Sequence, residues 1–256
     1  MKSMLFAAGL GTRLKPLTDT MPKAMVPVGG FPLIYHTLNR LIDQGANEIV
    51  VNVHHFASQI IDYVASRDWG VPVRISDESE ALLDTGGGLL QAATLFTPSD
   101  EPILIHNVDI LSNADLRTFY EANRDCEAAL MVSERVTQRY LLFDDEMRLR
   151  GWTNLATGEV RSPYPDLDVN SLHRYAFSGI HCFSPRLFEV MKDLGYAGRF
   201  PIMDFYLQAC AQVGIRGFVQ PDLQLLDVGK LDTLSAAERW LAGAPSSEKT
   251  SFLKRI

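Results

Sequence analysis

The sequence has few cysteines, no long apolar run and no repetitive segment, and each absence excludes a class of protein. Its three cysteines, Cys126, Cys182 and Cys210, are far apart and form no C-x-x-C pair, so a disulfide framework is not expected. The apolar stretch at Met4–Ala8 is too short for a signal-peptide core or a membrane span. We therefore expect a cytoplasmic protein with no membrane partner.

An excess of positive charge is also missing. The chain of 256 residues has 24 Lys and Arg against 31 Asp and Glu, a formal net charge of −7. Because a duplex-binding surface usually needs an excess of Lys and Arg, nucleic acid is not an expected partner. Hydrophobic residues make up 46% of the chain, which is enough to bury a proper core. A mildly acidic globular enzyme acting on metabolites fits these values.

Strand-like and helix-like apolar patterns alternate as far as about residue 130. The pattern predicts strands at 3–8, 48–53, 71–75, 102–108 and 128–132, and helices at 33–42, 56–65, 89–95 and 113–123. In this prediction glycines 86–88 break the chain just before the third helix, and Asn113 caps the fourth. Alternation of this kind is typical of an α/β fold, in which helices cover both faces of a parallel sheet.

The remainder of the chain is less regular. It predicts a hairpin at 140–153, a polar loop at 158–172, strands at 175–183, 216–219 and 223–227, and helices at 185–191, 201–213 and 230–241. No linker demands a second independent domain. We expect a single domain over residues 1–243, followed by a polar C-terminal tail at 244–256.

A glycine loop follows the first predicted strand and carries the clearest chemical signal. Gly9 and Gly11 allow close backbone approach to an anion, and Arg13 and Lys23 supply cationic side chains. Residues 1–42 contain five Lys and Arg and one acid, although the whole chain is acidic. The loop lacks the Gly-Lys-Ser/Thr of a Walker motif, and Leu14 stands where a dinucleotide fingerprint has glycine. A phosphate-rich ligand is indicated.

The segments G-L-G-T-R-L-K-P-L-T and P-K-A-M-V-P-V closely resemble the N-terminal signature of the sugar-1-phosphate nucleotidylyltransferases. The resemblance reaches to about residue 240 and implies a Rossmann-like, mixed and mostly parallel sheet. It also implies a nucleotide-binding half at roughly 1–130 and an acceptor-binding half at roughly 131–243. Arg13 and Lys23 would be catalytic by charge neutralisation. The triphosphate would bind over the residues Ala8, Gly9, Gly11, Thr12 and Arg13.

Two aspartates follow predicted strands and are candidate metal ligands. Asp109 ends an apolar strand, and Asp227 ends another before Val228-Gly229. Magnesium is commonly held by one or two carboxylates, with phosphates and waters completing its shell. The resembled family binds Mg²⁺ at both positions, within N-G-D and D-V-G-T patterns. Here Val108 replaces the glycine and Lys230 replaces the threonine, so close backbone approach of a sugar at Val108 is in question.

The resemblance also implies sites for the base and the acceptor. Residues Thr85, Gly86 and Gly87 would line the base pocket, and Asn107, Ser178 and Gly179 would contact the acceptor. For His181, which follows on the same predicted strand, a ligand and a plain strand residue are equally expected. The E-K-P segment, whose Lys grips the sugar phosphate in longer relatives, is absent. Arg161, His173 and Arg174 occupy that region instead.

These features predict a magnesium-dependent transfer of a nucleoside monophosphate from a nucleoside triphosphate to a sugar 1-phosphate, as in the compact uridylyltransferases and guanylyltransferases. Two alternatives stay open. One is a cytidylyltransferase for phosphocholine or a related alcohol phosphate, for which Trp152 and Tyr175 could form an aromatic box. The other is a nucleotide-sugar-binding regulatory module without turnover, because Val108 and Lys230 adjoin the proposed metal ligands.

Overall fold

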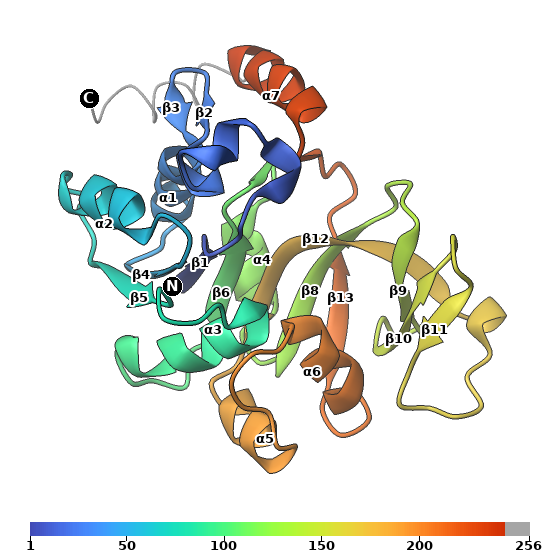
Figure 1. Cartoon of the computed structure of the whole chain (residues 1–256). Helices are drawn as coiled ribbons and strands as arrows, with labels where there is room; N and C mark the ends of the chain where they lie inside the picture. The colour runs from blue at the N-terminus through green and yellow to red at the C-terminus, as the bar shows by residue number, and fades with distance from the viewer. Residues whose placement is uncertain (244–256) are drawn as a thin grey trace.

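The computed structural model describes residues 1–243 of the chain. A central sheet runs through the molecule (Figure 1). Its N-terminal strands are β1 (Lys2–Phe6), β4 (Glu48–Val53), β5 (Val73–Asp77) and β6 (Ile103–Asn107). They lie side by side in the order β6-β1-β4-β5, and all are parallel. Strand β1 is buried along its whole length, as expected for a parallel strand covered on both faces. The carboxyl ends of these strands meet at one edge of the sheet.

The C-terminal strands extend this sheet from β12 (His173–Phe183), which is antiparallel to β6. The first residues of β12 pair with β9 and the following ones with β8. The other strands on this side are β8 (Ala128–Ser133), β9 (Arg139–Phe143), β10 (Leu149–Asn154), β11 (Glu159–Arg161) and β13 (Ile215–Val219). Strand β13 is parallel to β8, whereas β9, β10 and β11 form an antiparallel layer that projects from the body in Figure 1. The expected mixed, mostly parallel central sheet is confirmed.

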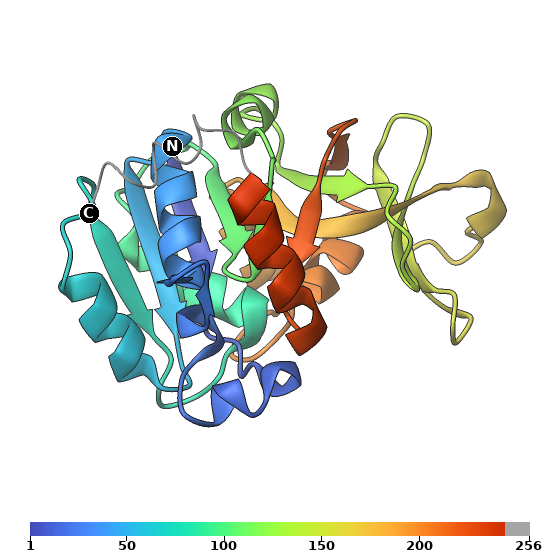
Figure 2. The same cartoon turned by 90° about the horizontal axis from the view of Figure 1, so that it is seen from above.

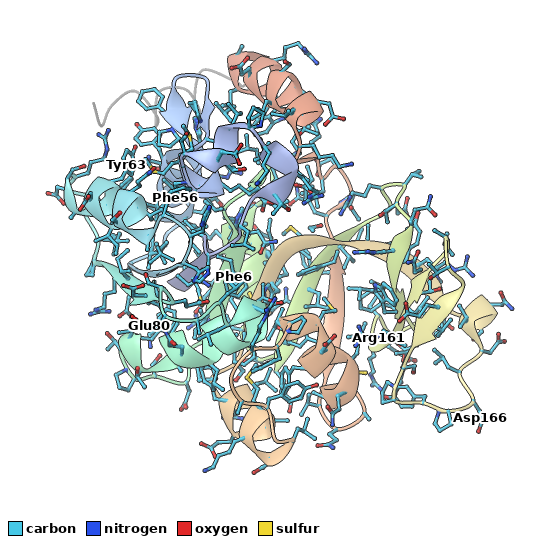
Figure 3. The ribbon with its side chains drawn as sticks, in the orientation of Figure 1. Phe6, Phe56, Tyr63, Glu80, Arg161 and Asp166 are labelled. Carbon is cyan, nitrogen blue, oxygen red and sulfur yellow. The ribbon has the colours of Figure 1, made fainter. Side chains whose placement is uncertain are left out.

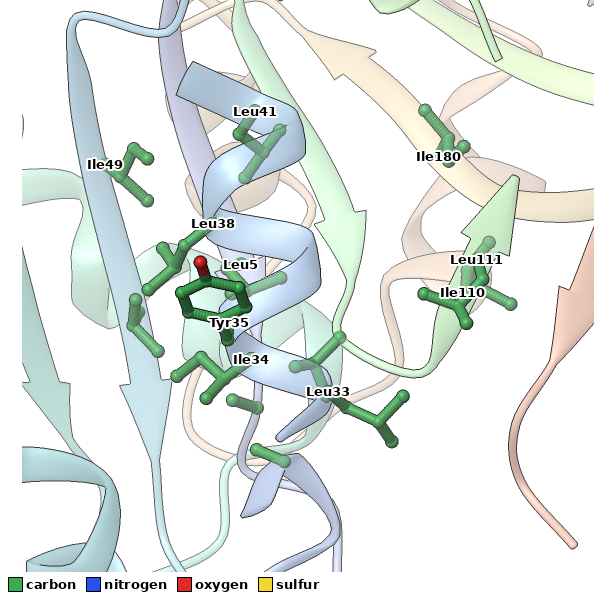
Figure 4. Close-up of a cluster of buried hydrophobic side chains, with 14 of the residues drawn as sticks. Leu5, Leu33, Ile34, Tyr35, Leu38, Leu41, Ile49, Ile110, Leu111 and Ile180 are labelled. Atoms are coloured by element: carbon green, nitrogen blue, oxygen red, sulfur yellow. The ribbon is translucent and has the colours of Figure 1, made fainter. Parts of the chain in front are cut away.

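Helices cover both faces of the sheet, also as expected (Figure 2). One face packs against α1 (Leu33–Asp43), α2 (Ala57–Ala65), α4 (Leu116–Ala122) and α7 (Leu231–Gly243). The other packs against α3 (Asp84–Ala92), α5 (Leu187–Asp193) and α6 (Ile202–Ala209). The two-residue period of β1 divides its side chains, because Leu5 joins the first core while Met4 and Phe6 join the second. Figure 4 shows Leu5 packed with α1 in the first core.

Two short antiparallel pairs lie outside the main sheet. The pair β2 (Pro27–Val28) and β3 (Phe31–Pro32) precedes α1. The pair β7 (Ile110–Ser112) and β14 (Leu225–Asp227) matters for function, because it joins the chain after β6 to a segment more than a hundred residues later. The predicted strand at 223–227 therefore exists, but its neighbour is β7 and not a strand of the main sheet.

Three local predictions are wrong. Glycines 86–88 lie inside α3, because the chain turns into the helix already at Asp84. Asp115, not Asn113, caps α4, since its carboxylate accepts a hydrogen bond from the Thr118 N–H at 2.9 Å. The polar segment 158–172 is not wholly a loop, because it contains β11 and a 3₁₀ turn at Val169–Ser171.

Within residues 1–243, no helix combines the length and apolarity that crossing a membrane would require. The predicted tail at 244–256 lies outside the described residues.

Candidate active site

The carboxyl ends of β1 and β6 open onto a cavity of about 310 Å³, here called cavity A. Binding at this edge of an open α/β sheet is expected, because the strand ends leave backbone groups and loop side chains free to face a ligand. The residues lining cavity A are Phe6, Ala7, Ala8, Gly9, Lys23, Asn52, Leu82, Asp84, Thr85, Asn107, Val108 and Asp109.

The two glycines of the N-terminal loop differ in what surrounds them. A Cβ atom at Gly9 would meet nothing within 4 Å, so the backbone there is open to a ligand. Gly11 has a φ of +64°, and a Cβ atom there would lie 2.8 Å from Cγ2 of Thr18 and 3.0 Å from Cβ of Lys23. Gly11 is thus required by the folding of the loop onto itself, and it does not line cavity A.

Asp109 and Lys23 contact each other through carboxylate and ammonium at the wall of cavity A. Both side chains are largely buried, with 17% and 11% of their surfaces exposed. An ammonium group removed from water to this extent needs a charged partner, and Asp109 supplies it. The predicted cationic and acidic residues are therefore brought together at one point of the cavity.

Asp227 reaches the same region through the β7–β14 pair. The Val228 N–H donates to the Asp109 carbonyl at 2.8 Å, which holds the two aspartate segments together. A Cβ atom at Gly229 would lie 2.5 Å from Asp227 Oδ1 and 2.8 Å from Arg13 Nη2. Gly229 therefore leaves room for the Asp227 carboxylate and the Arg13 guanidinium to flank the same backbone position.

The Asp227 carboxylate has an unusual environment. Its Oδ1 atom is buried and has no hydrogen-bond partner among the described residues. A buried carboxylate oxygen without a donor is costly, and a bound cation is one way to satisfy it. Within residues 1–243, no cluster of three or more His, Cys, Asp or Glu side chains could hold a metal by itself. Two carboxylates suit Mg²⁺, which takes its other ligands from phosphates and water.

The wall of cavity A is braced by Asn52, which the sequence did not single out. Its side chain accepts from the Ala7 N–H at 2.8 Å and donates to Glu78 Oε1 at 2.7 Å. Burial raises the pKa of Glu78 above its ordinary value. These contacts tie the end of β1 to the segment before α3, so the cavity is shaped before any ligand binds.

The glycines of α3 contact protein rather than open space. A Cβ atom at Gly86 would lie 2.2 Å from a ring carbon of Phe200, and one at Gly87 would lie 2.0 Å from the Gly198 carbonyl oxygen. The amides of both glycines also donate to the Phe200 carbonyl. Neither glycine lines cavity A or the cavity of about 320 Å³ beside it, whereas Thr85 lines both.

A second cavity of about 320 Å³, cavity B, adjoins cavity A and shares Phe6, Thr85 and Asn107 with it. Figure 3 shows Phe6 near the middle of the molecule, between the parallel strands and the β9–β11 layer. The remaining residues that line cavity B are Arg135, Thr137, Arg139, Leu141, Trp152, Phe177, His181, Ile202 and Met203. All of these come from the C-terminal half, and only Trp152 and His181 among them were considered from the sequence.

The three residues predicted to contact the acceptor differ in whether they line a cavity. Asn107 lines both cavities. Gly179 has a φ of +73°, and a Cβ atom there would lie 2.8 Å from Asn107 Nδ2, so this glycine makes room for the asparagine. Ser178 is buried, lines neither cavity, and its Oγ has no hydrogen-bond partner among the described residues. Both belong to an irregularity in β12, where the register with β8 shifts between Phe177 and His181.

His181 lies in the wall of cavity B, which favours a ligand contact over a plain strand histidine. Burial lowers its pKa to about 3, so the imidazole is neutral. Its Nδ1 is 2.7 Å from the Tyr206 hydroxyl, whose own pKa is raised well above the ordinary value by burial. With the hydroxyl proton donated to Nδ1, the ring carries its proton on Nε2 and can donate a hydrogen bond.

None of the residues that occupy the place of the E-K-P segment lines either cavity. Arg161 pairs with Asp204 at 2.7 Å, and the imidazole of His173 lies 2.9 Å from Asp145. Arg174 lines neither cavity, and Tyr175 packs against Phe143 in β9. Of the two aromatic residues considered for a choline box, only Trp152 lines cavity B.

The fold and the paired cavities define an α/β protein with one pocket at the carboxyl edge of its parallel strands and a second pocket beside it. A family model for nucleotidyl transferases matches residues 2–140. The chain belongs to the nucleotidyl transferase family, and the predicted relationship to sugar-1-phosphate nucleotidylyltransferases is confirmed.

Two relatives match almost the whole chain. An N-acetylmuramate α-1-phosphate uridylyltransferase from Caulobacter vibrioides is 32% identical over 249 residues, 94% of this chain and 97% of the relative. The enzyme of the same name from Neisseria meningitidis is 31% identical over 247 residues, 95% of this chain and 99% of the relative. Among solved structures, a UDP-glucose pyrophosphorylase complexed with UDP-glucose superimposes with a TM-score of 0.72 at 16% identity, covering 94% and 98% of the two chains.

Proposed function

We propose that the chain transfers a nucleoside monophosphate from a nucleoside triphosphate to a sugar 1-phosphate, releasing pyrophosphate and forming a nucleoside diphosphate sugar. The observation that carries the proposal is the pairing of the two cavities. Cavity A has an open glycine backbone, a lysine and an aspartate, and cavity B adjoins it through Phe6, Thr85 and Asn107. Two pockets with a shared wall allow two substrates to meet.

In this proposal the triphosphate lies over the loop from Ala8 to Arg13, and the nucleoside extends towards Thr85. Gly9 allows close approach of the phosphates, and Lys23 lies in the same cavity to neutralise them. Arg13 flanks Gly229 and faces the leaving pyrophosphate. Residues 1–130 thus act as the nucleotide half and residues 131–243 as the acceptor half of a single domain.

Asp109 and Asp227 fit a magnesium ion, because their segments are joined by a hydrogen bond and Asp227 Oδ1 is buried without a donor. The ion, when bound, supplies positive charge to the α-phosphate as negative charge develops there. In the ligand-free chain the Lys23 ammonium neutralises Asp109. The same ammonium is close enough to the cavity to serve the phosphates once they are present.

The reaction forms one bond and breaks one. An oxygen of the acceptor's phosphate attacks the α-phosphorus, the bond from that phosphorus to the bridging oxygen breaks, and pyrophosphate leaves. The attacking oxygen is already anionic, so no residue has to remove a proton. The protein contributes positioning and charge neutralisation, which provide most of the rate in phosphoryl transfer.

The two replacements that raised the regulatory alternative do not obstruct the site. Val108 lines cavity A, but it is only 4% exposed and packs into the core on α1. Lys230 is exposed at the start of α7, where its N–H faces Thr233 Oγ1 at 3.4 Å. It lines neither cavity. Both observations favour turnover.

A pyrophosphate-release assay tests the proposal. The four common nucleoside triphosphates are each combined with sugar 1-phosphates, including glucose, mannose and N-acetylmuramate 1-phosphates, and with phosphocholine, in the presence and absence of Mg²⁺. We expect release with one base and a sugar 1-phosphate, and only with Mg²⁺. Release with CTP and phosphocholine alone would favour the cytidylyltransferase alternative, and no release with any pair would favour the regulatory module.

A further inference from the structure

Two arginines and no acidic residue line cavity B. Arg135 and Arg139 both line it, and no ion pair to either residue is found within residues 1–243. Two arginines of the neighbouring layer behave differently, because Arg150 pairs with Asp144 and Arg161 with Asp204. The charge of cavity B is therefore available to a ligand in a chain whose overall charge is −7.

The segment that carries these arginines is held in place by its neighbours. Arg135 Nη2 donates to the Phe177 carbonyl at 3.0 Å, which fixes the guanidinium beside another cavity residue. The Thr137 N–H lies 3.0 Å from the Tyr140 hydroxyl, and the Leu155 N–H donates to the Gln138 carbonyl at 2.7 Å. These bonds brace the turn between β8 and β9, so the Arg135 guanidinium and the backbone that carries both arginines are positioned before a ligand arrives.

We propose that Arg135 and Arg139 form the subsite for the acceptor's phosphate, an inference that rests on the function proposed above. A phosphomonoester carries a charge of about −1.5 to −2 at pH 7, which two guanidinium groups match with bidentate hydrogen bonds. They make and break no covalent bond, and they hold the attacking oxygen towards cavity A through the shared wall at Asn107. This assigns to the turn before β9 and to the first residue of that strand the task that the absent E-K-P lysine performs in longer relatives.

The same pair narrows the class of acceptor. A phosphocholine carries a quaternary ammonium beside its phosphate, and cavity B has no carboxylate to receive that cation. A sugar ring is uncharged and can lie against Trp152 or Phe177, with His181 Nε2 as a hydrogen-bond donor. Cavity B thus suits a sugar phosphate whose sugar part is uncharged or anionic.

Steady-state kinetics on Arg135→Gln, Arg139→Gln and Arg139→Lys test the subsite. Each glutamine variant should raise the KM of the acceptor about 10- to 100-fold, the usual effect of losing hydrogen bonds to a charged group. The KM of the triphosphate should stay within about twofold, as the triphosphate does not contact these residues. Arg139→Lys should lie between wild type and glutamine, because lysine keeps the charge and loses the fork. Arg174→Gln, on β12 outside both cavities, is the matched control and should be unchanged.

Unchanged acceptor KM in both glutamine variants, or an equal rise in the KM of both substrates, would overturn the subsite. A wild-type protein without turnover would instead contradict the proposed function, and calorimetric titration with inorganic phosphate then tests the arginines independently. The Arg135→Gln/Arg139→Gln double variant should lose one phosphate site that Arg174→Gln retains. Equal phosphate binding by the wild type and the double variant would reject the inference.

Discussion

Cavities A and B are built in different ways. Cavity A lies at the ends of parallel strands and is lined in part by backbone, with Gly9 open and the charged pair Lys23 and Asp109 in its wall. Cavity B is lined by large side chains from β9, β10, β12 and α6, and its charge is purely cationic. The first design suits a phosphate chain common to all nucleoside triphosphates, and the second suits discrimination among acceptors.

The two cavities also differ in which charged groups lack a partner of opposite charge among the described residues. Near cavity A, Asp227 Oδ1 is a buried acceptor without a donor among the described residues, and in cavity B Arg135 and Arg139 are donors without a carboxylate. The unmatched groups at the two places therefore have opposite sign. The missing partners in this account are a magnesium ion and a phosphate, and the following variants separate these roles from plain structural ones.

The largest effect is expected from the metal side of cavity A. Asp109→Ala should lower turnover about 100-fold or more, by analogy with the loss of about 3 kcal/mol when one charge-stabilising contact is removed. Pyrophosphate release measures the loss, and circular dichroism checks that the fold is kept. Asp227→Asn is a second variant that keeps the side-chain shape. It should also lose turnover without losing thermal stability, because Oδ1 has no bond to break. Near-normal release by Asp109→Ala would count against the metal assignment.

A stability effect should distinguish packing glycines from ligand-facing ones. Gly87→Ala places a methyl group 2.0 Å from the Gly198 carbonyl oxygen, which forces the backbone apart. We expect a loss of about 3 kcal/mol in the free energy of unfolding, the upper range for overpacking. Urea denaturation of the ligand-free protein measures it. A variant as stable as the wild type would mean that α3 and the 198–200 segment separate at no cost.

Acid stability should depend on His106, a buried histidine of β6. Burial lowers the pKa of His106 from 6.5 to about 4, so as the pH falls from 6.5 towards 4 the unfolded chain gains a proton that the folded chain does not. The contribution of the neutral His106 to the free energy of unfolding is therefore complete above pH 6.5 and decreases as the pH falls. Between pH 8 and pH 5, the free energy of unfolding of His106→Gln should fall by about 2 kcal/mol less than that of the wild type. Denaturation midpoints of both proteins at the two pH values measure these losses. Equal losses in the wild type and the variant would show that His106 is protonated in the folded chain at pH 5.

The smallest stability change is expected at Gly9, the counterpart of Gly87 in cavity A. A methyl group there meets nothing within 4 Å, so Gly9→Ala should change the free energy of unfolding by less than about 1 kcal/mol. The same methyl group would project towards the bound phosphates and should raise the KM of the triphosphate about tenfold, a loss of about 1.4 kcal/mol in binding. Unaltered triphosphate kinetics would place the phosphates elsewhere.

The difference between the halves also decides what the sequence could predict. Gly9, Lys23 and Asp109 were predicted because they stand in contiguous segments after strands, where backbone direction and strand ends bring them together. Arg135, Trp152 and His181 meet in cavity B only through the pairing of β12 with β9 and β8, which periodicity does not specify. The order of strands was not readable from alternation, which predicts a parallel sheet and not the antiparallel insertion of β12.

The glycine run of α3 was misread for a related reason. Consecutive glycines usually break a helix, and tertiary packing against Phe200 and Gly198 reverses that preference here. Gly179 carried a similar ambiguity, since a glycine beside a ligand and a glycine beside Asn107 have the same sequence signature. Both cases required the position of a residue distant in the chain.

A crystal structure with a non-hydrolysable nucleoside triphosphate and Mg²⁺ tests the division into two cavities most directly. The account predicts phosphates over Gly9, the ion on both Asp109 and Asp227, Lys23 turned to the phosphates, and the α-phosphorus facing Arg135 and Arg139 across Asn107. Phosphates bound on those two arginines, or an ion that leaves Asp227 Oδ1 without a ligand, would contradict it.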